Sequence, residues 1–494
     1  MGDNSVKVPA TMDEIESYLS NDRLTSCIQK LKAKFGESYE KLLVSDVLDA
    51  KGHQYVNLVQ KGGGVLGISL VGYTYMLELV NIRFMRLAGT SAGAINTALM
   101  TVIGKKEDAK SKTVLKAIIE LNFFDLVDGH PVMRRLIRTF ITHTDFSIRL
   151  KRIVLGYILL LAFSIIGAFV FLGLEIKTPD LSIATRGFFV LTGLMILVLV
   201  LLFAYIDSLL KRFKDSGFGI NPGNFFYDWI KKRLRENDVI TVQDLIDKAG
   251  ADVDGLCMRD NRTESILDLR GDVTFITSEV ATENKIQFPE MCNLFSSDIN
   301  KLEPAGFIRA SMSIPIFFES YFIRDIQCET EEIKQAWKDR FNLSDPPTTA
   351  RFVDGGILSD FPMSIFYKPN INIPRLPSLG IDLDDNKPDD KKKHPGDWSI
   401  AGYFGRIFNT TRFYYDKDFL LKNKMFGKGI GKVPLCEFNW LNFFLKPEEK
   451  IDMFLKGAEA ATEFLLNFDW EEYKENRETI QKQLKNNLPA TNSY

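Results

Sequence analysis

Two short glycine-flanked motifs hold the residues best suited to nucleophilic chemistry. Residues 89–93 read GTSAG, a G-x-S-x-G pattern that places Ser91 between an apolar stretch and a run of small residues. A serine on a tight strand-to-helix turn is open to a substrate, and the helix N-terminus behind it favours developing negative charge. Asp354, followed by Gly355 and Gly356, has no bulky neighbour behind it and could approach the serine as a base. A carboxylate serves this purpose best where burial raises its pKa.

The chain offers few other bases for a serine. In α/β-hydrolases the order along the chain is serine, acid, histidine, and only His394 lies late enough for that order. It sits in a charged stretch, KKKHP, at residues 391–395. Asp354 is therefore the preferred base, with His394 as the alternative. The remaining histidines have neither an accompanying motif nor the spacing of a metal site; they are His53, His130 and His143.

A third glycine-rich segment, GGGVLG at residues 62–67, follows a short apolar strand. It matches the G-x-G-x-x-G pattern of dinucleotide-binding proteins. That function needs an acidic residue at the end of the next strand, where this chain has Ala88 and Gly89. A glycine run can instead direct several backbone N–H groups at one oxygen. The segment is therefore predicted to form an oxyanion hole beside Ser91, and a nicotinamide or flavin oxidoreductase is the alternative.

A parallel sheet is the simplest way to bring these motifs together. Apolar strands are predicted at residues 55–60 and 82–88, and each runs directly into a glycine motif and then a helix. Such strand–helix alternation is typical of parallel sheets with crossover helices. Further buried strands are predicted at residues 272–280 and 378–383. Apolar residues at helical spacing predict a closing helix over residues 447–468.

Two long apolar runs interrupt this pattern. Residues 153–174 and 187–206 carry no charged side chain, and each is long enough to cross a bilayer as a helix. The link between them, residues 175–186, is so short that the chain must leave and re-enter the membrane on the same side. The runs therefore predict a transmembrane hairpin, with a buried helical pair of a soluble domain as the alternative. After the hairpin, a basic helix at residues 225–236 is predicted to be a solvated face or a contact to anionic headgroups.

The charged residues beside the hairpin predict its orientation. Basic side chains precede the first run and follow the second, whereas the short link carries only two. By the positive-inside rule, both chain ends and all the motifs above face the cytoplasm. The expected location is thus the cell (inner) membrane, spanned twice. The flanking basic residues are Arg149, Lys151 and Arg152 before the hairpin and Lys211, Arg212 and Lys214 after it.

Composition narrows the remaining possibilities. The 494 residues are 45% hydrophobic and 26% charged, which is ordinary for globular protein. A net charge of −2 argues against a nucleic-acid partner. Five widely spaced cysteines without a CxxC pair predict reduced cytosolic thiols rather than disulfides or a zinc site. The N-terminus has no basic start followed by an apolar run, so it is not predicted to be a secretory signal.

Taken together, the three motifs resemble those of patatin-like phospholipases. That family has a GGG-x-x-G loop, then G-x-S-x-G, then a distant DG[AG] motif, in the order and spacing seen in this chain. Two further segments are similar to the family, IRASMSIP at residues 308–315 and DGGILSDFP at residues 354–362. The resemblance covers roughly residues 56–383 apart from the hairpin. No single motif is specific, but their combination is.

The resemblance implies a mechanism and a fold. Ser91 would attack an acyl ester while Asp354 takes its proton, in a Ser–Asp dyad without histidine. The implied fold is a three-layer α/β/α arrangement with a largely parallel central sheet, and the implied substrate is a glycerolipid that loses a fatty acid without a metal or other cofactor. The implied supporting residues are Gly62, Gly63, Gly64 and Val65 in the oxyanion hole, Gly89 and Gly93 in the nucleophile elbow, and Gly355 and Gly356 in the aspartate motif.

Two positions depart from the family pattern. Many members have Arg or Lys at the place of Leu66, so a positive charge near the oxyanion loop is missing here. The family often has Asn at the place of Asp360. The first departure is the sequence feature that favours an alternative function, an inactive membrane-tethered scaffold or lipid-binding protein with a hydrolase fold.

The predicted organisation follows from these elements. Residues 1–52 form a polar helical extension, residues 53–383 the hydrolase domain, and residues 384–494 a loop and closing helices. The hairpin at residues 153–206 is inserted in the hydrolase domain and is expected to hold it at the cytoplasmic leaflet. The predicted activity is cleavage of acyl chains from phospholipid or lysophospholipid through an acyl-serine intermediate.

Overall fold

The computed structural model describes residues 12–131, 134, 146–176, 178, 180, 182–215, 217–266, 269–368, 374–385, 400–475 and 478. The chain forms two compact units. We call the first the sheet unit; it comprises Met1–Val127, Gly223–Pro315 and Ser320–Tyr494. The second, the hairpin unit, comprises Asp128–Pro222 and Ile316–Glu319. The alternative base His394 lies outside the described residues, as does His143.

The strands of the described residues belong to one large mixed sheet, except for β4 and β9, which pair with each other in the hairpin unit. In chain order they are β1 (Val47–Leu48), β2 (Gln54–Gln60), β3 (Ile82–Thr90), β4 (Gly219–Asn221), β5 (Cys257–Met258), β6 (Asn261–Ser265), β7 (Asp272–Glu279), β8 (Asn284–Phe288), β9 (Ile316–Phe318), β10 (Tyr321–Ile323), β11 (Ala350–Asp354), β12 (Ser378–Asp384) and β13 (Ile430–Pro434).

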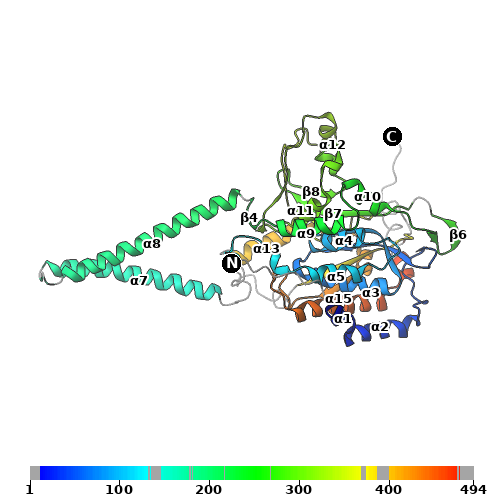
Figure 1. Ribbon diagram of the computed structural model, residues 1–494, viewed down its shortest axis with the longest axis horizontal. Helices are drawn as coiled ribbons and strands as arrows, with labels where there is room; N and C mark the ends of the chain where they lie inside the picture. The colour runs from blue at the N-terminus through cyan, green and yellow to red at the C-terminus, as the bar shows by residue number, and fades with distance from the viewer. Residues whose placement is uncertain are drawn as a thin grey trace, which may run out of the picture. The chain divides into compact units, whose positions relative to one another are not determined.

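Figure 1 shows the helices of the described residues, most of them with their labels. They are α1 (Met12–Leu19), α2 (Asp22–Phe35), α3 (Ile68–Leu79), α4 (Ala92–Val102), α5 (Ser111–Glu120), α7 (Phe146–Glu175), α8 (Ser182–Asp215), α9 (Asn224–Arg235), α10 (Val242–Gly250), α11 (Pro304–Ser311), α12 (Glu331–Phe341), α13 (Ile400–Arg412), α14 (Tyr414–Lys422) and α15 (Pro447–Asn467). Short 3-10 turns include η1 (Gly64–Gly67), η6 (Gly355–Ile357) and η9 (Lys424–Gly429).

Five parallel strands form the centre of the sheet, in the order β13–β12–β2–β3–β7. β2 is buried along its whole length and β3 along nearly all of it, as expected for parallel strands covered on both faces. Antiparallel strands complete the sheet, with β11 and β8 both pairing with β7. The predicted mixed α/β fold with a largely parallel sheet is confirmed. β13 lies beyond the predicted boundary at residue 383, so the C-terminal part of the chain contributes to this sheet as well.

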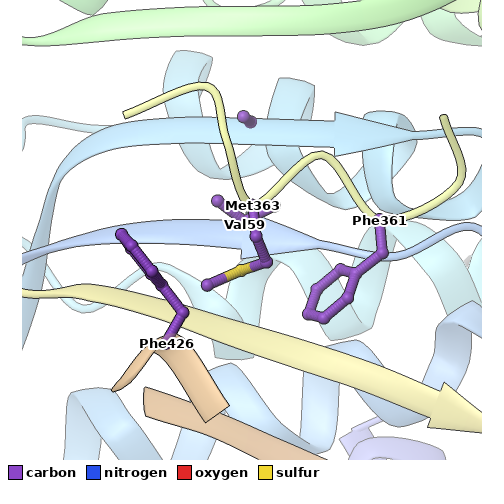
Figure 2. Close-up of a cluster of buried hydrophobic side chains, with 5 residues drawn as sticks. Val59, Phe361, Met363 and Phe426 are labelled. Atoms are coloured by element: carbon purple, nitrogen blue, oxygen red, sulfur yellow. The ribbon is translucent and has the colours of Figure 1, made fainter. Parts of the chain in front are cut away.

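Neighbouring residues of β2 show how the two faces are covered. Gln60 points to α4, where its side-chain N–H donates to the Thr97 hydroxyl at 2.9 Å. Val59 points to the opposite face, into a buried cluster with Phe361, Met363 and Phe426. Figure 2 shows this cluster against the strands. Because α14 and η9 also pack on it, helical segments lie on both faces of the sheet, as the predicted three-layer fold requires.

The closing helix is also present. α15 covers the predicted stretch and packs on α3, so closely that an added Cβ at Gly72 or Gly457 would meet the backbone of the other helix. The described part of the N-terminal extension contributes α1 and α2, followed by the short strand β1. Helix α9, which is predicted to be basic, forms ion pairs with acidic residues elsewhere in the chain. Lys231, for example, contacts Glu303 at 2.7 Å.

The hairpin unit contains the two predicted apolar runs. They lie within α7 and α8, which are longer than the runs themselves and pack side by side (Figure 1). By length and composition, both helices could cross a membrane. Polar groups meet between them: the Ser164 and Thr192 hydroxyls lie 2.6 Å apart, and the Tyr157 hydroxyl donates to the Met195 carbonyl at 2.6 Å. Their outward surface is apolar, and Phe203, for example, is 74% exposed.

Candidate active site

The register of β7 brings the predicted nucleophile and base together. Ile276 of β7 pairs with Thr90, the last residue of β3, and the next residue, Thr277, pairs with Asp354, the last residue of β11. The other edge of β7 at both positions is occupied by β8. β3 and β11 therefore meet end to end along one edge of β7. Ser91 and Asp354 lie at this junction, although they are far apart in the sequence.

Ser91 sits on the tight turn that the G-x-S-x-G motif predicts. Its backbone is in a strained region, with φ 52° and ψ −118°, and α4 begins at the next residue. The flanking glycines have no room for side chains. A Cβ at Gly89 would collide with the carbonyl of Gly93, and one at Gly93 with the carbonyl of Gln60. The small residues of the motif are thus explained by the close approach of β2, β3 and α4.

One short segment at the end of α11 holds both sides of the junction. The Ser91 N–H donates to the Ser311 hydroxyl at 2.9 Å, and that hydroxyl donates to the Ile276 carbonyl of β7 at 2.6 Å. Two residues on, the Ser313 carbonyl accepts from the Asp354 N–H at 2.8 Å. This segment lies within residues 308–315, a stretch that resembles the family but whose role the sequence alone does not explain. Its role is to connect the turn that carries Ser91 with the strand that carries Asp354.

Asp354 is a buried carboxyl with one occupied oxygen. The Gly356 N–H donates to its Oδ1 at 2.7 Å, and its Oδ2 accepts no hydrogen bond of ordinary geometry from the described residues. Burial raises its pKa to about 6, and the negative charge of Asp360 adds to the rise. Hydrogen bonding from the Ser91 hydroxyl and the positive charge of Arg412 both favour the ionised carboxylate and lower this pKa.

The amides of the glycine loop are not equivalent. The Gly62 N–H donates to the Asp360 carbonyl at 3.0 Å, and the Val65 N–H donates to the Trp440 carbonyl at 3.1 Å. These two of the four predicted oxyanion donors therefore support the loop itself. Gly62 also lies against the elbow, since a Cβ there would stand 3.2 Å from the Cβ of Ser91.

The two central amides of the loop remain. Within the described chain, the N–H groups of Gly63 and Gly64 donate to no other residue. Gly64 has a φ of 56°, and a Cβ there would meet the carbonyl of Trp440. Leu66, where the family often has a cation, is only 1% exposed and packs into the core. The loop, whose first residue Gly62 lies against Ser91, thus offers two free donors and no cation of its own.

Positive charge reaches the site from a distant helix instead. Arg412, the last residue of α13, has its Nη2 3.3 Å from Oδ1 of Asp360, and its Nε donates to the Gly356 carbonyl. Asp360 is only 4% exposed, and burial raises its pKa, whereas Arg412 and Lys61 lower it. Arg412 was not identified from the sequence, because no recognisable motif surrounds it.

A third buried carboxylate secures the loop between Asp354 and Asp360. Asp416 of α14 accepts from the Ser359 hydroxyl at 2.7 Å and from the Phe361 N–H at 2.8 Å. Burial raises its pKa to about 6. Sequence reasoning missed this residue too.

Over the ranges that the structure describes, no group of three or more His, Cys, Asp or Glu is arranged to bind a metal ion.

Comparison with known proteins identifies the family of the chain. The sequence model of the family described as "Patatin-like phospholipase" matches residues 58–367, well over half of the chain. The chain belongs to the patatin-like phospholipase family. It is also similar to the uncharacterized protein YqhO of Bacillus subtilis (strain 168), with 22% identity over 411 residues that cover 83% of this chain and 98% of YqhO.

Among solved structures, this patatin-like chain is similar to VipD from Legionella pneumophila. The TM-score is 0.35 and the identity 12%, over 86% of this chain and 70% of VipD. We infer nothing further from so limited a similarity. Family membership agrees with the resemblance drawn from the three motifs and supports lipid acyl hydrolase activity.

The raised pKa of Asp354 predicts a pH-dependent gain in stability for Asp354→Asn. An aspartate in the unfolded chain titrates near about 3.9, so folding favours the protonated carboxyl and stability falls as pH rises from about 4 to 6. Removing the charge should therefore raise the free energy of unfolding by on the order of 2–3 kcal/mol at pH 8, and hardly at all near pH 4. Thermal unfolding across this range measures it. The exposed Asp339→Asn serves as control, and an equal gain at both pH values contradicts the prediction.

Proposed function

We propose that the chain is a membrane-anchored serine hydrolase that cleaves fatty acyl esters of phospholipids or lysophospholipids. The observation that carries the proposal is the junction on β7, where Ser91 on a strained turn meets Asp354, a buried carboxyl with a pKa of about 6. A base of that pKa is ionised at neutral pH, yet basic enough to take a proton from a serine in the transition state. Membership of the patatin-like phospholipase family supports the lipid substrate.

The residues suggest the following steps. Asp354 takes the hydroxyl proton of Ser91 as Oγ attacks the ester carbonyl, and the amides of Gly63 and Gly64 stabilise the resulting oxyanion. The C–O bond to the alcohol then breaks, and the proton passes from Asp354 to the leaving lysolipid or glycerol oxygen. In the second half, Asp354 takes a proton from water, which attacks the acyl-serine. Fatty acid leaves and Ser91 recovers its proton.

The hairpin supports anchoring in a bilayer. Its inner polar groups are hydrogen-bonded between α7 and α8, while its outer surface is apolar and exposed. Exposing such a surface to water is unfavourable, and lipid chains remove that cost. With basic residues before the first apolar run and after the second, the proposal places both chain ends in the cytoplasm at the inner membrane.

Replacement of either dyad residue should abolish acyl transfer. Ser91→Ala and Asp354→Asn should each lower kcat/KM for a soluble short-chain ester by at least about a thousandfold, because one removes the nucleophile and the other its base. A fluorophosphonate should label Ser91 in the wild type, found by mass spectrometry, and much less in Asp354→Asn. Full activity in Ser91→Ala would contradict Ser91 as the nucleophile, and no labelling of the wild type on vesicles would favour the inactive scaffold instead.

The charges around Asp354 should set the acidic limb of the pH profile. With wild-type protein, kcat/KM should rise through an apparent pKa of about 6, since Asp354 must be ionised. Asp360→Asn removes a negative charge and should move the limb to lower pH, whereas Arg412→Gln removes a positive charge and should move it to higher pH, each by about 0.5–1 unit. Shifts in the same direction for both variants exclude Asp354 as the titrating base.

The proposed topology can be tested on the full chain. The protein should stay with the membrane on extraction at alkaline pH. In a Cys436→Ser background, a cysteine at Thr178, in the link between α7 and α8, should react with a membrane-impermeant maleimide from the outside of intact cells. A cysteine at the exposed Gln29 of α2 should react only after lysis. The reverse pattern contradicts the orientation, and release by alkali contradicts the span.

A further inference from the structure

Helices α13 and α14 touch the candidate active site with one side. Arg412, at the end of α13, contacts Asp360 and Gly356, and Asp416, in the first turn of α14, holds Ser359 and the Phe361 amide. Both side chains bind the loop that follows Asp354. The position of this helix pair and the position of that loop are therefore linked.

The other side of the helix pair is apolar and exposed. We call it the α13–α14 face and define it by Tyr403, Ile407, Tyr414, Tyr415 and Leu421, which are 52%, 45%, 67%, 49% and 70% exposed. Among the described residues of the sheet unit, only two other large hydrophobic side chains are as open, Ile240 and Val280. Exposed apolar residues are common singly, but their gathering on one helix pair marks an interaction surface.

The charge of the same segment indicates an anionic partner. Residues 400–424 contain five basic and two acidic side chains, although the whole chain has a net charge of −2. Arg412 and Asp416 both point inward, to Asp360 and Ser359, and Asp418 pairs with Lys422 at 2.6 Å. Lys417 and Lys424 are exposed. Tyrosines with aliphatic residues and lysines are the composition of segments that lie at the boundary between headgroups and acyl chains.

We propose that the α13–α14 face docks on the surface of an anionic lipid bilayer, with its apolar side chains at the level of the first acyl carbons. The inference rests on the proposed function, because an anchored lipid hydrolase must present its site to the bilayer that contains its substrate. Docking would place the segment that carries Arg412 and Asp416 in lipid contact. The state of the membrane would then act directly on the loop after Asp354.

A local probe tests docking without any catalysis. The full chain is prepared with Leu421→Cys and Cys436→Ser, labelled with an environment-sensitive fluorophore, and reconstituted in vesicles of phosphatidylcholine and phosphatidylglycerol. Four other cysteines are buried. The matched control is Gln29→Cys on α2, also exposed. The label at position 421 should shift to the blue and be quenched by spin-labelled lipid, and the label at position 29 should not.

The other outcomes overturn the proposal. A label at position 421 that stays water-like shows that the face does not meet lipid. A blue shift without lipid quenching shows that a second copy or another protein covers the face instead. Because neither readout depends on turnover, failure of the hydrolase proposal does not imitate failure of docking.

Turnover supplies a second, independent test. Tyr414→Asp with Leu421→Asp should lower hydrolysis of vesicle phospholipid about tenfold or more, since two apolar contacts with the bilayer are lost. Hydrolysis of a soluble short-chain ester should stay within about twofold, because neither residue contacts the dyad. Ile240→Asp, at an exposed apolar position elsewhere, should change neither rate. Equal loss on both substrates, or no loss on vesicles, contradicts docking, whereas full activity of Ser91→Ala contradicts only the hydrolase proposal.

Discussion

The candidate site depends on one constraint, the edge of β7 on which two strands end. β3 arrives parallel to β7 and β11 antiparallel, and their last residues face consecutive residues of β7. A slip of one residue in either pairing would turn the side chains at the junction to the opposite face of the sheet. The hydroxyl of Ser311, between the Ser91 amide and the Ile276 carbonyl, fixes this register from a third element. The positions of Ser91 and Asp354 are thus decided by backbone pairing rather than by contacts of the two side chains.

The glycine motifs could be predicted from the sequence because their small residues are required by close contacts with neighbouring backbone. Gly89 and Gly93 are small because backbone carbonyls stand where their side chains would be. β2 and β3 were predictable because buried parallel strands are continuously apolar. The same reasoning located the hairpin, although the helices extend past the uncharged runs.

The residues that contact the site from distant parts of the chain could not be predicted, because no motif surrounds them in the sequence. Arg412 and Asp416 lie in helices of ordinary polarity and acquire their meaning only where the fold places them beside Asp360 and Ser359. Nor could the sequence rank the four loop amides. Which of them are occupied depends on carbonyls of Asp360 and Trp440, residues that meet the loop only in the folded chain. Substituting Asp for the family's usual Asn adds a buried charge, and the contact with Arg412 offsets it.

The place of the hairpin in the chain has a consequence for the order of synthesis. The glycine loop and Ser91 precede α7, whereas β7, Ser311 and Asp354 all follow α8. A chain emerging from the ribosome therefore carries its nucleophile before it has the strand on which that nucleophile is aligned, or the carboxyl proposed to activate it. Both apolar helices are complete before β7, Ser311 or Asp354 is made. A nascent chain thus holds Ser91 without Asp354 until its hairpin has been made, so the proposed dyad is completed only after the proposed membrane segment.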